Sequence, residues 1–124
     1  VTVTLRKSYG GAHDVMSCKQ LRGDFNYAWP TAQIAVMGAK GAIEVLYGKE
    51  VAAITDPEAK AKFIAEKEEE YNHAFANPYK AASYGYIDDV IEPRNTRFRV
   101  IRAFQSLQTK RVTNPMKKHS NIPL

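Results

Sequence analysis

The sequence predicts an α/β fold in which short strands, glycine turns and helices form stacked layers. One observation is a repeated local order: a strand, a glycine turn and a helix follow one another at 5–16 and again at 34–46. The other is a clearly delimited charged helix between 56 and 74. Strands that alternate with helices are typical of layered α/β domains.

The first unit begins with the alternating apolar residues of 1–5, which predict a strand. A tight turn at Gly10-Gly11-Ala12 follows, and the next residues begin a helix. Peptide N–H groups at a helix start lack intrahelical partners, and the helix dipole adds partial positive charge there. The turn could therefore hold an anion or a developing oxyanion with backbone alone, although a plain turn explains the same spelling.

The second unit consists of a short strand, Asn26–Trp29, and a largely buried strand, Ala32–Met37. Pro30 stops the first of these strands and Gly38 ends the second. The stretch 38–42 is a second glycine-rich turn, and it leads into an apolar helix over Ala42–Tyr47. Close packing of helix on strand is the simpler reason for its glycines.

The charged helix begins at Thr55-Asp56-Pro57-Glu58, which spells a capping box with proline in the first turn. Its remaining faces are strongly charged, so we expect a surface helix packed along one stripe. The stripe comprises Ala59, Phe63, Lys67 and Tyr71. Asn77-Pro78 breaks the helix, and 78–84 predicts a further short helix closed by Gly85.

The last third predicts a short strand over Tyr86–Ile91 and a final helix capped near Asn95 or Thr96. The apolar stripe of that helix is predicted at Val100, Ile101, Phe104 and Leu107, with its arginines facing away. The tail, 114–124, lacks periodicity and should be extended.

Length and composition indicate part of a larger protein. The 124 residues suffice for one domain or a portion of one, and the chain opens on Val1 inside a predicted strand. No apolar run approaches membrane-spanning length.

Cys18 is the single cysteine, so an intrachain disulfide is impossible and a reducing compartment fits. We expect Cys18 to be a small buried residue rather than a nucleophile, because His13 lies five positions away.

The formal charge of +5 gathers late in the chain, between Arg94 and Lys118. Such a cluster could meet the phosphates of RNA or of coenzyme A, or an acidic partner, or could simply be a solvated helix face. An RNA-binding module remains an alternative of another class, but the arginines lack interleaved aromatics and match no nucleic-acid motif.

Common catalytic and metal motifs are missing from the sequence. The histidines, His13, His73 and His119, stand in no metal-ligand spacing, so no metal is expected. Neither a phosphate-binding P-loop nor a nucleophile elbow occurs. Asp88 and Asp89 are adjacent, so in a strand they would point to opposite faces and could not cooperate.

Several stretches resemble the carboxyl-terminal end of the carboxyltransferase (β) subunit of propionyl-CoA carboxylase and its acyl-CoA carboxylase relatives. The matching stretches are 6–16, 26–32, 34–42, 75–78, 88–93 and 118–124. The resemblance implies a crotonase-like fold of stacked β-β-α turns. It also implies that 1–124 is the C-terminal portion of the biotin-side domain, and that the acyl-CoA-binding N-terminal domain lies outside this chain.

The implied reaction moves a carboxyl group from carboxybiotin, carried on a separate subunit, to the α-carbon of propionyl-CoA, giving methylmalonyl-CoA. Gly11 and Ala12 would supply the N–H groups of an oxyanion hole for the ureido oxygen of biotin. Gly10 and Asp14 would line the substrate site, and Asp14 stands at a position that influences acyl-chain choice. His13 departs from the family, where tyrosine is common, and the acidic helix at 56–74 is longer than in many relatives.

The resemblance further implies acyl-CoA and a biotin carboxylase or biotin carrier subunit as partners, and homo-oligomers that are hexameric at full length. It implies no nucleic acid and no membrane, and a cytoplasmic (bacterial) or mitochondrial matrix location. We expect the fragment alone to be inactive. A biotin-dependent methylmalonyl-CoA decarboxylase, which runs the same chemistry backwards, remains a close alternative.

Overall fold

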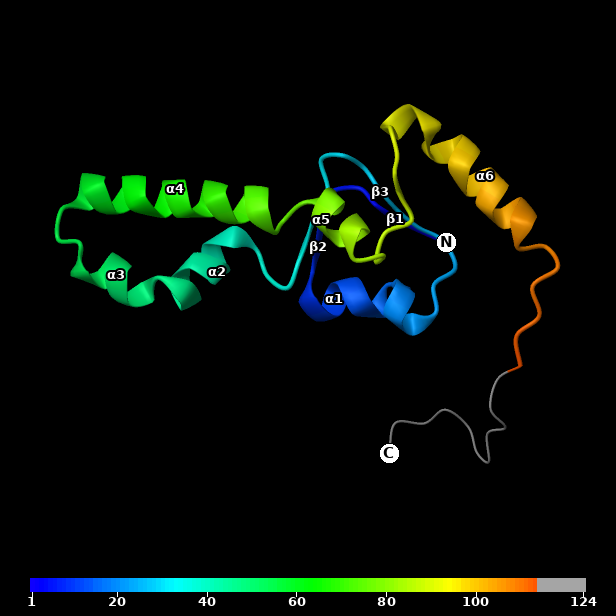
Figure 1. Ribbon diagram of the computed structural model, residues 1–124, viewed down its shortest axis with the longest axis horizontal. Helices are drawn as coiled ribbons and strands as arrows, with labels where there is room; N and C mark the ends of the chain where they lie inside the picture. The colour runs from blue at the N-terminus through cyan, green and yellow to red at the C-terminus, as the bar shows by residue number, and fades with distance from the viewer. Residues whose placement is uncertain (114–124) are drawn as a thin grey trace.

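The structure is a computed structural model, and it describes residues 1–113. The tail expected at 114–124 lies outside the described residues. The ribbon consists of a layered β/α body and a helical arm that projects from it (Figure 1). No described helix is both long and apolar enough to cross a membrane.

The body contains a parallel three-stranded sheet in the order β1-β3-β5. Its strands are β1 (Thr2–Thr4), β3 (Asn26–Ala28) and β5 (Asp89–Val90). Val3 pairs with Tyr27, and Tyr27 pairs with Asp89 on its other side. All three residues of β3 are buried, as expected of a central strand.

A second, two-stranded parallel sheet joins β2 (Lys7–Tyr9) to β4 (Gln33–Ala35), with Ser8 opposite Ile34. The sequence did not reveal β2 as a separate strand, and β4 is shorter than the strand predicted at Ala32–Met37. Each unit therefore contributes one strand to each sheet before its helix. This strand–strand–helix order, with equivalent strands paired in parallel, is the β-β-α stacking that the resemblance implied.

Two helical segments follow β2: α1 (Gly10–Val15) and the 3₁₀ turn η1 (Lys19–Leu21). Cys18 lies between them and is buried, as predicted.

The arm consists of α2 (Ala39–Leu46), α3 (Gly48–Ala53) and α4 (Pro57–Ala74). Figure 1 shows α2 and α3 lying alongside α4, away from the sheets. Tyr47 meets Phe63 edge to face, with the ring centroids 6.2 Å apart. The predicted helix at Ala42–Tyr47 starts earlier than expected, at Ala39, and α3 was not predicted at all.

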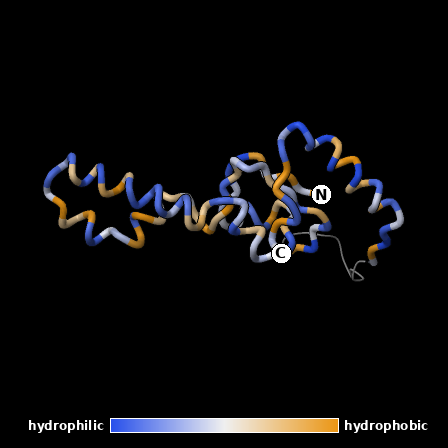
Figure 2. Tube along the Cα trace, turned by 45° about the horizontal axis from the view of Figure 1, so that its top comes forward, coloured by the Kyte–Doolittle hydropathy of each residue, from blue (hydrophilic) through white to orange (hydrophobic). Residues whose placement is uncertain are grey.

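Helix α4 confirms the predicted charged helix and its surface position, because none of its residues is buried. Hydrophilic and hydrophobic residues alternate along the trace of the arm (Figure 2). The predicted capping box was wrong in detail, since the N-cap is Asp56 rather than Thr55. The Asp56 carboxylate accepts hydrogen bonds from the N–H groups of Glu58 and Ala59, at 3.3 and 3.2 Å.

The remaining helices are α5 (Pro78–Ser83), the 3₁₀ turn η2 (Pro93–Asn95) and α6 (Thr96–Ser106). Gly85 ends the α5 region with a φ of +78°, as its place in the sequence suggested. Asp88 pairs with Lys19 and Asp89 with Arg99, so the two adjacent carboxylates contact different cations.

The predicted apolar stripe of α6 was right for Val100 and Leu107, which are half-buried, and wrong for Ile101 and Phe104. Ala103 is the buried residue of this helix, whereas Ile101 and Phe104 remain 45% and 58% exposed. Arg99 does not face away, because its guanidinium lies 5.2 Å from the centroid of the Tyr27 ring and pairs with Asp89. The small Ala103 side chain lets α6 approach the sheet closely, and the larger residues turn outward.

Two buried clusters hold the body together. One joins both sheets to α5 through Ala28, Ile34, Ala81 and Ile87. The other, Tyr27, Ile91 and Ala103, lies under α6.

Candidate functional site

The glycine turn follows β2 directly, and α1 begins at Gly10 itself rather than after the turn. Gly10 has a φ of +52°, and a Cβ at this position would lie 3.0 Å from the carbonyl oxygen of Val36. Both features favour glycine, because other L-residues are strained at this φ and the added atom would press on the β4 connection. Gly10 thus fixes how α1 approaches β4.

Gly11 and Ala12 form the first turn of α1 and are both exposed. A Cβ at Gly11 would meet nothing within 4 Å. The N-cap residue, Tyr9, has an extended backbone and makes no side-chain cap to the helix. The first N–H groups of a helix have no intrahelical acceptor, so the amides of this turn can donate hydrogen bonds to an acceptor outside the helix.

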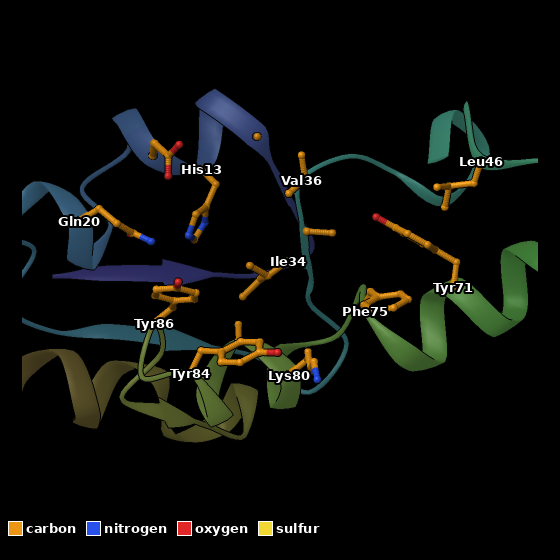
Figure 3. A pocket seen from close by; sticks show the side chains of 14 residues that line it. His13, Gln20, Ile34, Val36, Leu46, Tyr71, Phe75, Lys80, Tyr84 and Tyr86 are labelled. Carbon is orange, nitrogen blue, oxygen red and sulfur yellow. The ribbon is translucent and has the colours of Figure 1, made fainter. Parts of the chain in front are cut away.

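An open cavity of about 490 Å³ lies beside this turn. Figure 3 shows His13 entering it from α1, while Tyr84 and Tyr86 close the opposite side. The lining residues are Gly10, His13, Asp14, Gln20, Ile34, Ala35, Val36, Leu46, Tyr71, Phe75, Lys80, Ala81, Tyr84 and Tyr86. The structure thus brings Gly10 and Asp14 into one wall, while Gly11 and Ala12, next to them in the chain, are not part of the lining.

The polar groups of the cavity come from two sides. On the α1 side, the Nδ1 atom of His13 lies 2.8 Å from the Ser8 hydroxyl, and Asp14 Oδ1 lies 3.8 Å from Cys18 Sγ. On the α5 side, the Lys80 ammonium lies 5.0 Å from the centroid of the Tyr84 ring. An anion and a cation therefore face one cavity from different elements.

Aromatic rings make up much of the remaining wall, and sequence reasoning missed them. Tyr84 and Tyr86 have ring centroids 6.1 Å apart, and those of Tyr71 and Phe75 are 5.4 Å apart. The available signal was the high density of aromatic residues between 71 and 86. An apolar, aromatic wall with a few polar groups is typical of a small-molecule site.

The second glycine-rich turn has a packing role. A Cβ at Gly38 would lie 3.3 Å from a carbon of the Tyr9 ring. The glycine therefore permits the close approach of α2 to the end of β2, in agreement with the helix–strand packing expected from the sequence. A smaller cavity of about 290 Å³ lies within the arm, between α2, α3 and α4.

Some charges elsewhere in the described chain pair with each other. The pKa of the Asp24 carboxyl is held below its usual value because Lys110 donates a hydrogen bond to it. Two members of the basic cluster, Arg99 and Lys110, thus pair with acids of this chain. Within residues 1–113, no three histidine, cysteine or acidic side chains gather as a metal site.

Residues 1–122 match the family model of the carboxyl transferase domain. The propionyl-CoA carboxylase beta chain of Cereibacter sphaeroides is 60% identical over all 124 residues, which cover 23% of that protein. The methylmalonyl-CoA carboxyltransferase 12S subunit of Propionibacterium freudenreichii subsp. shermanii is 50% identical over 123 residues, again 23% of its length. The chain thus spans about a quarter of these relatives.

Solved structures agree with the layered fold. A transcarboxylase 12S crystal structure, a hexamer with methylmalonyl-coenzyme A and methylmalonic acid bound, matches 98% of this chain and 23% of its own. The TM-score is 0.83 at 50% sequence identity. The beta subunit of P. aeruginosa geranyl-CoA carboxylase, at 22% identity and a TM-score of 0.67, shares the fold. The predicted crotonase-like α/β fold is confirmed.

Proposed function

The chain belongs to the carboxyl transferase domain family, and from this we propose that its parent protein moves a carboxyl group from carboxybiotin to the α-carbon of propionyl-CoA. The product would be methylmalonyl-CoA. The single observation that carries this proposal is the 60% identity, along the whole chain, to a propionyl-CoA carboxylase beta chain. Mitochondrial relatives of the same name, such as the rat beta chain, remain 50% identical.

We assign residues 1–124 to the C-terminal portion of the biotin-side domain and the acyl-CoA-binding domain to a part of the protein outside this chain. The stretches that resemble the end of the family's subunit support this assignment. Since the chain covers 23% of its relatives, most of the catalytic protein lies elsewhere, and the fragment alone should not turn over.

Gly11 and Ala12 are the proposed oxyanion-hole donors, and Gly10 and Asp14 the proposed substrate-contacting residues. The carboxybiotin substrate supplies the carboxyl group, and its ureido oxygen gains negative charge as that group leaves. The backbone amides of Gly11 and Ala12 would donate hydrogen bonds to that oxygen. Preorganised amides cost no reorganisation when the charge develops, which is why such a site needs no side-chain acid.

The local geometry fits this role. The turn is exposed, no side chain of the described residues caps it, and Gly11 leaves open space where a side chain would stand. The neighbouring cavity would accommodate a small heterocycle against aromatic walls.

A substitution at Gly11 in the full-length protein tests the site. Gly11→Leu places a side chain beside the amides without meeting protein atoms near its Cβ, so the fold should persist. Loss of an oxyanion-hole donor typically lowers kcat about 10²- to 10³-fold. Gly48→Leu is the matched control, because Gly48 also opens a short helix and also has free space at Cβ. Equal turnover in the two variants would remove Gly11 from the site.

The reaction partners follow from the same proposal. Carboxybiotin would arrive on a biotin carrier associated with a biotin carboxylase, and the subunits would form homo-oligomers, up to the hexamer described for the transcarboxylase 12S relative. A cytoplasmic location in bacteria or the mitochondrial matrix fits relatives of both kinds.

The transfer in the opposite direction is the second candidate. The 12S relative is named for methylmalonyl-CoA and is 50% identical to this chain, so identity does not assign the direction. Supplying the full-length protein with methylmalonyl-CoA and free biotin measures that direction. An irreversible loss of carbon dioxide would indicate the decarboxylase, whereas carboxyl exchange in both directions would indicate the transferase. RNA binding has no supporting observation, since the family model covers 1–122.

A further inference from the structure

A hydrogen-bonded pair, Ser8 and His13, lies at the edge of the cavity. Ser8 belongs to β2 and His13 to α1, and the Ser8 Oγ atom is 2.8 Å from Nδ1 of His13. Both residues are half-buried. The pairing of Ser8 with Ile34 across the second sheet fixes the backbone that carries the hydroxyl, so one side of the imidazole is anchored.

The two members of the pair face different surroundings. His13 lines the cavity, whereas Ser8 does not. In Figure 3 the His13 ring points into the space between Gln20 and Ile34. Since Nδ1 is turned toward Ser8, the opposite nitrogen, Nε2, is the ring atom available to a ligand in the cavity.

A nucleophilic serine activated by histidine is a different use of such a pair, and the geometry disfavours it. Ser8 is absent from the cavity wall, so its hydroxyl could not reach a reacting atom there. The nearest acid in the chain, Asp14, has its Oδ1 atom beside Cys18 Sγ, at 3.8 Å. Ser8 is therefore suited to position His13, and His13 to contact the ligand.

We propose that His13 is a substrate-contacting residue of the biotin-side cavity, held by Ser8 so that Nε2–H donates a hydrogen bond to the transferable carboxylate of carboxybiotin. This inference rests on the proposed function. When the Ser8 hydroxyl donates to Nδ1, the proton of the neutral ring resides on Nε2 and faces the cavity. The amides of Gly11 and Ala12, in the same turn of α1, would take the ureido oxygen, which leaves the carboxylate as the acceptor for the imidazole.

The test uses the full-length protein and carboxyl transfer from free carboxybiotin to propionyl-CoA. His13→Phe removes the donor but keeps a planar ring, and it should lower kcat/KM for carboxybiotin about tenfold, the usual effect of losing one hydrogen bond to a charged group. The KM for propionyl-CoA should change less than twofold. His13→Gln, which retains an N–H donor, should recover part of the loss, and Ser8→Ala should lower kcat/KM less than His13→Phe does.

His73→Phe is the matched control, because His73 is exposed on α4 and does not line the cavity. Unfolding temperatures of all variants separate loss of contact from loss of fold. If the wild type transfers the carboxyl group and folded His13→Phe equals the His73→Phe control, the inference is wrong while the proposed function stands. If His13→Phe raises the KM for propionyl-CoA instead, His13 contacts the other substrate and the inference is again wrong. Absence of transfer in the wild type would overturn the proposed function itself.

Discussion

Gly10 and Gly11 are neighbours in the chain, but the backbone constrains them differently. Gly10 has a positive φ and a carbonyl oxygen 3.0 Å from where its Cβ would stand, whereas Gly11 has neither constraint. The first glycine therefore serves the fold and the second leaves room at the proposed site.

This difference predicts opposite effects of alanine on stability. Gly10→Ala should lower the free energy of unfolding by about 1–3 kcal/mol, because an L-residue is strained at this φ. Gly11→Ala should be neutral or stabilising by up to about 1 kcal/mol, since alanine is the better helix former. Urea unfolding of the full-length protein measures both, and a Gly11→Ala cost as large as that of Gly10→Ala would refute the assignment.

Asp14 lines the cavity, and in its proposed role a longer apolar acyl chain would have to desolvate its carboxylate. Asp14→Leu should therefore raise the ratio of kcat/KM for butyryl-CoA to that for propionyl-CoA, by about tenfold for one methylene. Steady-state assays with both thioesters measure the ratio. Asp14→Asn, which keeps the size and removes the charge, is the control and should give a smaller change; an unchanged ratio in the leucine variant would contradict the role.

At the scale of elements, α4 depends on its cap because none of its residues is buried. Asp56→Ala removes the acceptor of two N–H groups and should destabilise the helix start by about 1 kcal/mol. Amide hydrogen exchange of Glu58 and Ala59 should accelerate accordingly. Thr55→Ala is the matched control. An equal acceleration in that variant would indicate that Thr55 also caps the helix, as the predicted capping box required.

The ion pair of Asp24 with Lys110 ties the segment after α6 to the loop before β3. The pKa of Asp24 is lowered in the folded protein, chiefly by the hydrogen bond from Lys110, so unfolding restores a higher pKa. The pair therefore stabilises the fold above the ordinary aspartate pKa and is lost as the pH falls through the lower, folded-state value. The protection factors of amides at the end of α6, which correct for the pH dependence of intrinsic exchange, should fall in acid, and Asp24→Asn should abolish that fall.

Local signals predicted some elements well and others poorly. The strand at Asn26–Ala28 and the helix at 57–74 have strong start and stop residues, and both were found near their true limits. Strand β2 has only three residues, and its pairing with β4 defines it, which no local pattern reveals. The stripe of α6 was partly misplaced because Ala103, rather than a larger residue, faces the sheet.

For the whole molecule, the candidate site was predictable only in part. The glycine turn is local, so the sequence could place its residues close together; Gly10 and Asp14 line the cavity, whereas Gly11 and Ala12 do not. The aromatic wall comes from α4 and from the residues after α5, and only the fold brings these to α1. The sequence did not predict Ser8 as the partner of His13 either, because no local sequence pattern indicates a hydrogen bond between β2 and α1.

Helix α6 exposes large apolar side chains. Phe98, Ile101 and Phe104 remain 59%, 45% and 58% exposed on α6. Side chains three residues apart share one face of a helix, so α6 presents an apolar face to its surroundings.

The proposed reaction is tested most directly by following a labelled carboxyl group from carboxybiotin to propionyl-CoA in the full-length protein. We expect labelled methylmalonyl-CoA with the wild type and with Gly48→Leu, and a loss of about 10²-fold or more with folded Gly11→Leu. Failure of the wild type to label the acyl-CoA, or full activity of Gly11→Leu, would contradict the proposal.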